Sequence, residues 1–572
     1  MKTSFLLASV LSRPALLAAA SLLTLAAGAA PVVPGASAGS SSGPAAVVQH
    51  EHSEFEATLL APYAGDATSR TQPDARTFTL SFEYPGLAAP RAARWQLDLL
   101  APSGRVVATW QGVLTLTVQP LDVTVRWPGL VDGRTAAPGI YRVRMGASTG
   151  MGDAAEDVEQ AWDIGVGAIS APALPAFQPL PTGHTVQSPD AAPAPSALPY
   201  TVYYGNLHSQ TGDSDGGAPL SECKGAQEPQ SAPYGPAAAY PYARDHGLDF
   251  LMVSEHNHMY DGSDGTKSDA DPARAKHLYH AGLQTARDFS AANPGFLALY
   301  GLEWGVISKG GHLNIFNTDE LLGWEQTAKG DLLADTATAR GDYAALYTLM
   351  RQRGWVGQFN HPATGGQFAI DGKPLAYTAD GDAAMALCEV MNSAAFSNRD
   401  DESETRRSNF EQACNKLLEA GYHVAFSSNQ DNHCANWGAS YSNRSAVLLP
   451  NGVPLTRASF LDALRARRVF ATRDKHAQLV LTANGRLMGE RFDNSGPLSL
   501  QVHYASDNGR RAASVALMQG VPGRNGTVTP FAKNPDTTFT PTPGPHFYYA
   551  KVTQDDGALL WSAPVWVDQH QP

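Results

Sequence analysis

Hydrophobic and polar residues alternate with two different periods along the chain, and the period changes near residue 200. Between residues 51 and 167, short runs such as RTFTLSFEY and RWQLDLLAP alternate residue by residue and are separated by Pro and Gly. Runs of period two are typical of half-buried strands. We therefore predict an N-terminal β-sandwich over residues 51–167. The Pro- and Ala-rich stretch 168–199 has no periodicity and predicts a linker.

Residues 200–472 show a different pattern, in which apolar runs alternate with helical segments. The runs include TVYYGNL, LDFLMVS and FLALYGLEW, and a helix is predicted within SETRRSNFEQACNKLLEAG, which Gly421 ends. Strands that alternate with helices indicate parallel β/α construction. Residues 476–572 return to period two and predict a C-terminal β-sandwich. Both flanking zones lack a cluster of titratable residues, which favours a stabilising or substrate-orienting role for them.

The beginning of the chain predicts export. Lys2 and Arg13 accompany an uncharged stretch rich in Ala and Leu, Pro14 to Ala30. This arrangement is typical of a secretory leader, which we place at residues 1–38. No second apolar stretch is long enough to span a bilayer, so we expect no membrane span after leader removal. The expected location is periplasmic or extracellular.

Nearly every predicted strand of the central zone runs directly into a histidine or a carboxylate. In parallel β/α barrels the C-terminal strand ends form the active face, so we expect these side chains to converge. Imidazole and carboxylate without thiolate suit Mn, Fe or Zn. A bound ion lowers the pKa of water to about 7 in favourable cases, which supplies hydroxide for hydrolysis near neutral pH. The side chains at these strand ends are His208, Asp215, Glu255, His256, Glu303, His312, His361, Asn392, Asp431 and His433.

The order of these motifs resembles that of a known superfamily. LHSQT…SDG, GLDFLMVSEHN, GLEW, GHLNI, NHP and DNH follow one another between Tyr204 and roughly Asn443, as in the PHP superfamily of polymerase-associated and histidinol phosphatase domains. The resemblance implies a distorted seven-stranded (β/α)7 barrel, here flanked by the two sandwiches, and a centre of up to three ions. Carried over by motif, the metal ligands would be His208, Asp215, His256, Glu303, His312, His361, Asp431 and His433.

The chain departs from the family pattern in its first motif. Asn206-Leu207-His208-Ser209-Gln210 stands where the family usually has D-L-H-x-H, so one histidine ligand is missing. Gln210 offers only a neutral amide oxygen, which binds a transition ion less well than imidazole. We therefore expect one to three divalent ions (Mn, Fe or Zn), with Gln210 and Asn392 as auxiliary residues.

Three residues are predicted to act in catalysis. Glu255 replaces the aspartate of the family's T-D-H turn, and either orients His256 or shuttles a proton, or else is a surface acid that caps the next segment. His312 and His361 are expected to combine metal ligation with substrate contact.

Three functions remain open from the sequence. The resemblance favours an exported hydrolase of phosphate esters, on a small-molecule or polymeric substrate. NLHSQT, SEHN, GHLN and the flanking β-modules also resemble the carbaryl hydrolase-like branch, which implies carboxylester or carbamate hydrolysis at the same site. The third is a non-catalytic envelope protein that binds glycan or polymer. The sequence does not predict an oligomeric state.

The net charge argues against nucleic acid binding, and the cysteine content allows disulfides. The formal net charge of −13 gives no electrostatic reason to bind nucleic acid phosphates. The four cysteines, an even number in an oxidising compartment, allow two disulfides. Their pairing is open, although Cys223 and Cys434 each lie close to a motif of the predicted site, which favours that pair. The other two are Cys388 and Cys414.

Overall fold

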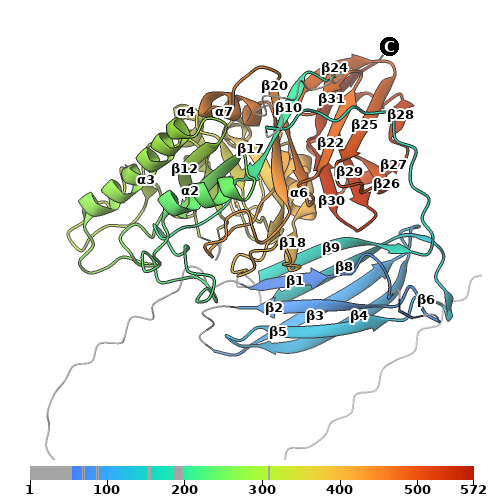
Figure 1. Ribbon diagram of the computed structural model, residues 1–572, viewed down its shortest axis with the longest axis horizontal. Coiled ribbons are helices and arrows are strands. Elements are labelled where there is room, and N and C mark those ends of the chain that lie inside the picture. The colour runs from blue at the N-terminus through green and yellow to red at the C-terminus, as the bar shows by residue number, and fades with distance from the viewer. Residues whose placement is uncertain are drawn as a thin grey trace, which may run out of the picture. The chain divides into compact units, whose positions relative to one another are not determined.

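The computed structural model describes residues 55–571, except for 67, 70, 85, 86, 88, 151–155, 184–197 and 307–309. The predicted leader, residues 1–38, lies outside the described residues, and the predicted linker is described only in part. The described chain is a mixed α/β structure rich in sheets and with few helices (Figure 1). Within these residues, none of the helices combines the length and the apolar character needed to cross a bilayer.

Two sheets form the first zone, as the alternation predicts. Their hydrogen-bonded orders are β1-β2-β5 and β4-β3-β8-β9. Phe78 and Leu80 of the first sheet and Leu97 and Val143 of the second are fully buried in one cluster, while the residues between them face outward. The strands are β1 Glu56–Leu60, β2 Arg76–Glu83, β3 Arg91–Leu100, β4 Val106–Leu116, β5 Leu121–Trp127, β8 Gly139–Thr149 and β9 Glu156–Val166, with the short pair β6 Leu130–Val131 and β7 Arg134–Thr135.

Seven strands of the central zone follow one another through hydrogen bonds. They are β10 Tyr200–Asn206, β11 Phe250–His256, β12 Leu297–Trp304, β13 Leu313–Ile315, β16 Gly357–Phe359, β17 Met385–Ser393 and β19 Ala425–Ser428. Beyond β19 the chain returns to the end of β10, because Asp431 N donates to His208 O (2.9 Å) and Gln210 N donates to Asn432 O (2.8 Å). Among the described strands β19 itself pairs only with β17, so this link is made by the residues that follow β19.

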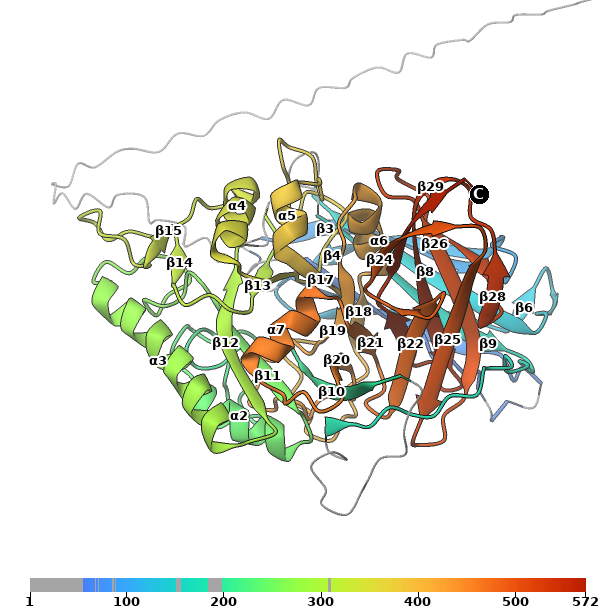
Figure 2. The ribbon, with the colours of Figure 1, turned by 90° about the horizontal axis from the view of Figure 1, so that it is seen from above.

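Helices lie on the outer side of these strands (Figure 2). Helix α3 packs on β12, and α2 packs on β11 and α3. The buried side chains of α3, such as Tyr279 and Leu283, form the stripe that faces the strands. The helices are α2 Pro236–Asp245, α3 Pro272–Ala292, α4 Tyr343–Arg353, α5 Ala379–Ala384, α6 Glu411–Ala420 and α7 Arg457–Arg465, and a short strand pair, β14 Leu322–Gly323 and β15 Thr336–Ala337, lies between α3 and α4 in the sequence.

The expectation of purely parallel construction is wrong at β13, which runs antiparallel to both β12 and β16. Only residues 305–312 connect β12 to β13, and a parallel pair needs a crossover of about a dozen residues or more. His312 therefore precedes its strand instead of ending it. Because the strand is reversed, His312 still lies at the same edge as Glu303, which ends β12.

The helix predicted within residues 403–421 begins later than expected, at Glu411. Residues Arg407–Asn409 form β18, which pairs antiparallel with the end of β17. Asn409 also bonds to the first sandwich, since its N donates to Gln160 Oε1 (2.6 Å) and its Nδ2 donates to Ala161 O (3.0 Å). These long-range contacts override the local helical pattern, whereas the predicted stop at Gly421 is confirmed by its left-handed φ of 119°.

The last zone shares a sheet with the central one. β21 pairs with β20 on one side and with β30 on the other, so the central strands continue into β30, β29, β26 and β27. The second sheet has the order β23-β22-β25-β28. The strands are β20 Arg444–Pro450, β21 Val469–Thr472, β22 Ala477–Ala483, β23 Arg486–Leu487, β24 Arg491–Ser495, β25 Leu498–Ser506, β26 Ala512–Gly520, β27 Thr529–Ala532, β28 Asp536–Phe539, β29 Gly544–Gln554, β30 Leu559–Ser562 and β31 Val565–His570.

Two disulfides join Cys223 to Cys434 and Cys388 to Cys414. The pairing of Cys223 with Cys434 confirms the prediction. Both bonds are compatible with an oxidising compartment.

Candidate metal centre

Glu303, at the end of β12, lies at the centre of a group of four histidines. Its Oε1 is 3.1 Å from His312 Nδ1 and 3.4 Å from His361 Nε2. Its Oε2 is 3.0 Å from His208 Nε2 and 3.5 Å from His256 Nδ1. These residues come from the ends of β10, β11 and β12, the start of β13 and the end of β16, so the strand ends meet as the sequence predicts.

Two aspartates extend this group. Asp215 Oδ1 is 3.7 Å from His256 Nε2 and 3.6 Å from His433 Nε2. Asp431 Oδ1 is 3.0 Å from His208 Nε2. All eight predicted ligands therefore lie in one cluster. Within it, three groups each offer ligand atoms within 4.8 Å of one another: His208, Glu303 and His361; Asp215, His256 and His433; and His256, Glu303 and His312.

The cluster is buried on one side and open on the other. The side chains of His208, Asp215, His256, Glu303 and His312 are at most 2% exposed, whereas those of His361, Asp431 and His433 are 13%, 12% and 6% exposed. The last three thus line the side of the cluster that solvent and a substrate can reach.

Two of the residues on the open side have strained backbones. His361 has a φ of 25° and Asp431 a φ of 51°, in the left-handed region that residues with a Cβ seldom adopt. Such strain persists where the surrounding structure imposes it, and it gathers at ligand and active sites. Here it turns both side chains towards Glu303 and His208.

The charges of the cluster are strongly coupled. Burial alone would lower the pKa of His208, but Asp431, Glu303 and Glu389 raise it well above its ordinary value. Burial alone would raise the pKa of Glu303, but His208, His312 and His256 hold it well below the ordinary value. Burial raises the pKa of Asp215 to about 6. The arrangement therefore stabilises a positive charge on His208, whereas burial lowers the pKa of His312.

The auxiliary residues both contact the ligands. Gln210 Nε2 donates to Glu303 Oε2 (2.6 Å), and its Oε1 is buried without a hydrogen-bond partner among the described residues. Asn392 Nδ2 donates to Glu389 Oε2 (3.3 Å) and to Asp431 Oδ2 (3.4 Å).

Glu255 has different surroundings from those expected of a catalytic residue. It neighbours His256 on β11, and successive side chains of a strand point to opposite faces. Its carboxylate accepts hydrogen bonds from the hydroxyls of Thr211 and Ser214 and from Thr211 N. Burial raises its pKa to about 8. These contacts favour a role in holding the loop that carries Gln210 and Asp215, and its role in proton transfer stays a prediction.

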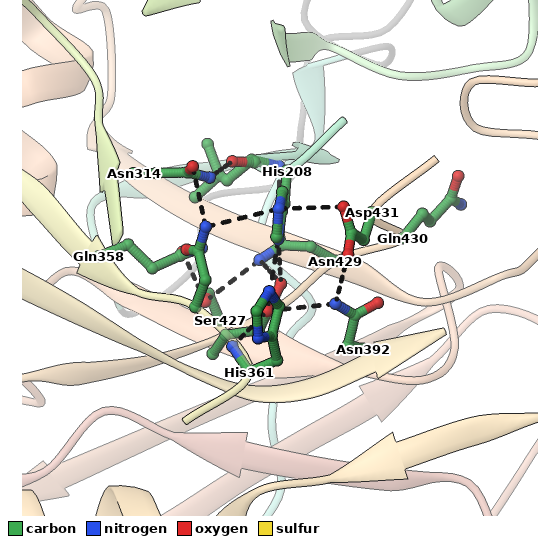
Figure 3. A network of polar contacts seen from close by, with 12 residues as sticks. His208, Asn314, Gln358, His361, Asn392, Ser427, Asn429, Gln430 and Asp431 are labelled. Atoms are coloured by element: carbon green, nitrogen blue, oxygen red, sulfur yellow. Dashed lines mark hydrogen bonds and ion pairs between the residues drawn. The ribbon is translucent and has the colours of Figure 1, made fainter. Parts of the chain in front are cut away.

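Glu389, which was not among the predicted site residues, supports the cluster through its contacts with His208 and His361. Its Oε1 lies 3.2 Å from His208 Nδ1 and accepts from Asn429 Nδ2 (2.9 Å), while its Oε2 accepts from His361 N (2.8 Å). Figure 3 shows this network around His208. Asn360 adds to it, because its Nδ2 donates to Glu303 Oε1 (2.8 Å). The run MALCEVMN contains the only signal for Glu389, a carboxylate inside an apolar strand.

The residues present fit divalent ions. Both carboxylate oxygens of Asp215 are buried, and neither accepts a hydrogen bond within the described part of the chain. A buried carboxylate without hydrogen bonds costs free energy unless a cation compensates it. Asp493, Asp568 and His570 form a second group of ligand atoms, but all three are exposed.

Comparisons with known proteins give no family for this chain. No family model matches it, and no curated protein matches it. Among solved structures, β-glucuronidase 2 from Bacteroides uniformis, bound covalently to cyclophellitol-6-carboxylate aziridine, is 9% identical with a TM-score of 0.15; the match covers 90% of this chain and 61% of that one. A putative β-galactosidase from Bacteroides fragilis is 9% identical over 90% of this chain and 73% of that one, with a TM-score of 0.14. Likeness at this level carries no argument about fold or function.

Proposed function

We propose that this protein is a metal-dependent hydrolase, with phosphate esters as its favoured substrates. The observation that carries the proposal is the convergence of four histidines on Glu303, with two aspartates and His433 beside them. Mixed imidazole and carboxylate sets suit Mn, Fe or Zn. The hydrogen-bonded order of the seven strands, and the hydrogen bonds that link the segment after β19 to the end of β10, support the distorted barrel that the motif resemblance implies.

The three groups of ligand atoms overlap, which supports more than one ion. Glu303 belongs to two groups, and so does His256. His208, Glu303 and His361 would hold one ion, Asp215, His256 and His433 a second, and His312 would complete a third set. A divalent ion bound there would act as a Lewis acid that activates water and stabilises developing negative charge.

The position of each residue in the cluster indicates whether it contacts the substrate or orients a ligand. His361, Asp431 and His433 line the open side, so they meet the substrate first. Glu389 holds the ring of His208 through Nδ1, which leaves Nε2 directed at Glu303 and Asp431. The buried amide oxygen of Gln210 has no hydrogen-bond partner among the described residues, so it is free to accept a hydrogen bond or to act as a weak ligand.

Metal analysis of the purified protein, before and after chelation, tests the proposal together with hydrolysis of p-nitrophenyl phosphate, bis(p-nitrophenyl) phosphate and p-nitrophenyl acetate. We expect bound Mn, Fe or Zn, loss of phosphoester hydrolysis on chelation, and recovery when the metal is returned. Preference for the acetate would favour the carboxylester or carbamate hydrolase instead.

A pair of variants locates the ions. His256→Ala removes a ligand from two of the three groups, so metal content and hydrolysis should fall together. His570→Ala changes the exposed group and should leave both unchanged. Full metal content and full turnover in His256→Ala would overturn the proposal.

A further inference from the structure

A small hollow lies between the first sandwich and the central zone. Glu56, Thr58, Ser81 and Glu83 line it from β1 and β2, and residues 393–396 with Arg406 line it from the central zone. Its volume is about 30 Å³. A space of this size holds one or two waters or a small polar group of a substrate.

The wall opposite the sandwich is made by the segment that supports the ligands. His433 N donates to Ala395 O (2.9 Å), and the rings of Phe396 and His433 lie 4.8 Å apart. Ser393 Oγ donates to Gln430 O (2.6 Å). The hollow therefore adjoins the segment that contacts His433 and Gln430, the residue before Asp431.

The two glutamates of the sandwich wall are unequally compensated. Glu56 and Glu83 are directly opposite in the register of β1 and β2, an arrangement in which like charges repel. Glu83 Oε1 lies 3.3 Å from Arg406 Nη1. No described residue forms a hydrogen bond or ion pair with the Glu56 carboxylate. Arg406 therefore compensates the charge of Glu83, while the charge of Glu56 stays uncompensated.

Glu56 lines the hollow together with Phe396, whose ring contacts the ring of the ligand His433. Burial, then Glu83 and Asp431, raise its pKa to about 7, while His361 and His433 lower it. The three ligands that act on it are the three most exposed of the eight. A charge on Glu56 therefore acts on whatever approaches the cluster from solvent.

We infer that the N-terminal sandwich forms one wall of the active site and that Glu56 repels dianionic groups there, so that the site accepts phosphodiesters and uncharged esters in preference to phosphate monoesters. This inference rests on the proposed function for its substrate class. A phosphodiester carries one negative charge and a phosphate monoester two at mildly alkaline pH, so one uncompensated carboxylate opposes the monoester more strongly.

Glu56→Gln tests the inference, because the side chain keeps its size and loses its charge. We expect inorganic phosphate to bind the metal-loaded variant about three- to tenfold more tightly than the wild type at mildly alkaline pH, by isothermal titration calorimetry. The ratio of kcat/KM for bis(p-nitrophenyl) phosphate to that for p-nitrophenyl phosphate should fall by a similar factor. Glu56→Ala should change both in the same direction.

Glu159→Gln is the matched control. Glu159 is an exposed residue of β9 in the same sandwich and does not line the hollow. Glu159→Gln removes one negative charge, as Glu56→Gln does, and we expect it to change neither the phosphate affinity nor the ratio of kcat/KM values. Metal content should stay at the wild-type value in both variants. The melting temperature of Glu56→Gln should not fall, since the variant relieves the repulsion from Glu83.

The outcomes separate this inference from the proposed function. Tighter phosphate binding in Glu56→Gln without hydrolysis of any ester would support the wall and overturn the hydrolase. Hydrolysis with unchanged phosphate affinity and an unchanged substrate ratio would keep the hydrolase and overturn the wall. Equal effects of Glu56→Gln and Glu159→Gln, or no phosphate binding by either protein, would also overturn it.

Discussion

The central cluster and the group formed by Asp493, Asp568 and His570 offer the same types of ligand, yet they differ in burial. In the central cluster no ligand side chain is more than 13% exposed. The His570 and Asp493 side chains are 53% and 79% exposed. Water solvates exposed charges at no cost, whereas buried charges need partners. Burial, more than residue type, distinguishes a candidate metal centre from an exposed cluster of charges.

The two groups also differ in how they are held. Cys434 follows His433 directly and is bonded to Cys223, and Cys388 precedes Glu389 and is bonded to Cys414. The exposed group lies on β24 and β31, where Asp493 is paired with Asp568 in the register. Segments distant in sequence are thus fixed around the central cluster, while the exposed group depends on one strand pair.

If burial sets the importance of a charged group, the largest change in stability should come from Glu411 and Lys551. Lys551 Nζ lies 2.6 Å from Glu411 Oε2, and the side chains are 3% and 11% exposed. Lys551→Met should cost about 3–5 kcal/mol of unfolding free energy at neutral pH, because it leaves a buried carboxylate without its cation. Urea denaturation measures this loss.

The control is the more exposed pair of Lys475 and Glu402, whose side chains are 34% and 27% exposed. Lys475→Met should cost about 1 kcal/mol or less. Lys551 and Arg142 overcome the effect of burial and hold the pKa of Glu411 below its ordinary 4.5. The pair therefore stabilises the fold above that pH, and the difference between wild type and Lys551→Met should shrink as the pH falls below it. Equal losses of unfolding free energy in Lys551→Met and Lys475→Met would show that burial does not set the importance of a charged group.

A smaller effect, on metal affinity, is expected at Glu389, which contacts the ligand His208. Glu389→Gln keeps the shape but weakens the contact to His208 Nδ1, so metal affinity should fall about 10- to 100-fold, measured by competition with a chelator. Glu419 is the matched control: it is buried and accepts hydrogen bonds from the backbone of residues 526–528, and none of its described hydrogen bonds is to a ligand residue. Glu419→Gln should leave metal affinity unchanged. Wild-type affinity in Glu389→Gln would show that burial beside a ligand is insufficient.

Most of the ligand set was predictable because its members stand close to the ends of apolar runs, and strand ends of a β/α unit meet at one edge; His312 instead precedes its strand. His256 and Glu303 even share a register position on β11 and β12. Glu389 was harder to recognise. The nine residues of β17 are all buried, so period two does not tell which face Glu389 occupies, and its partner His208 lies 181 residues away.

Two other features depended on long-range contacts. The start of α6 is set by the pairing of Arg407–Asn409 with β17 and by the bonds of Asn409 to the sandwich, which no local pattern reports. Glu56 lies in a zone without a cluster of titratable residues, and its position becomes informative only when β1 lies beside residues 393–396. By contrast, the short connection between residues 305 and 312 already contained the signal for the reversed direction of β13.

The smallest effect is expected in the exposed group. His570 Nε2 lies 2.8 Å from Asp493 Oδ1, and this hydrogen bond raises the pKa of His570 above 6.5. A raised pKa stabilises the fold below the ordinary pKa, and this contribution is lost as the pH rises through the raised value. Asp493→Asn should lower the pKa of His570 in an NMR titration while melting temperature and metal content stay unchanged, because solvent screens both side chains. A loss of bound metal in Asp493→Asn would place an ion at the exposed group, and burial would then no longer separate the two groups.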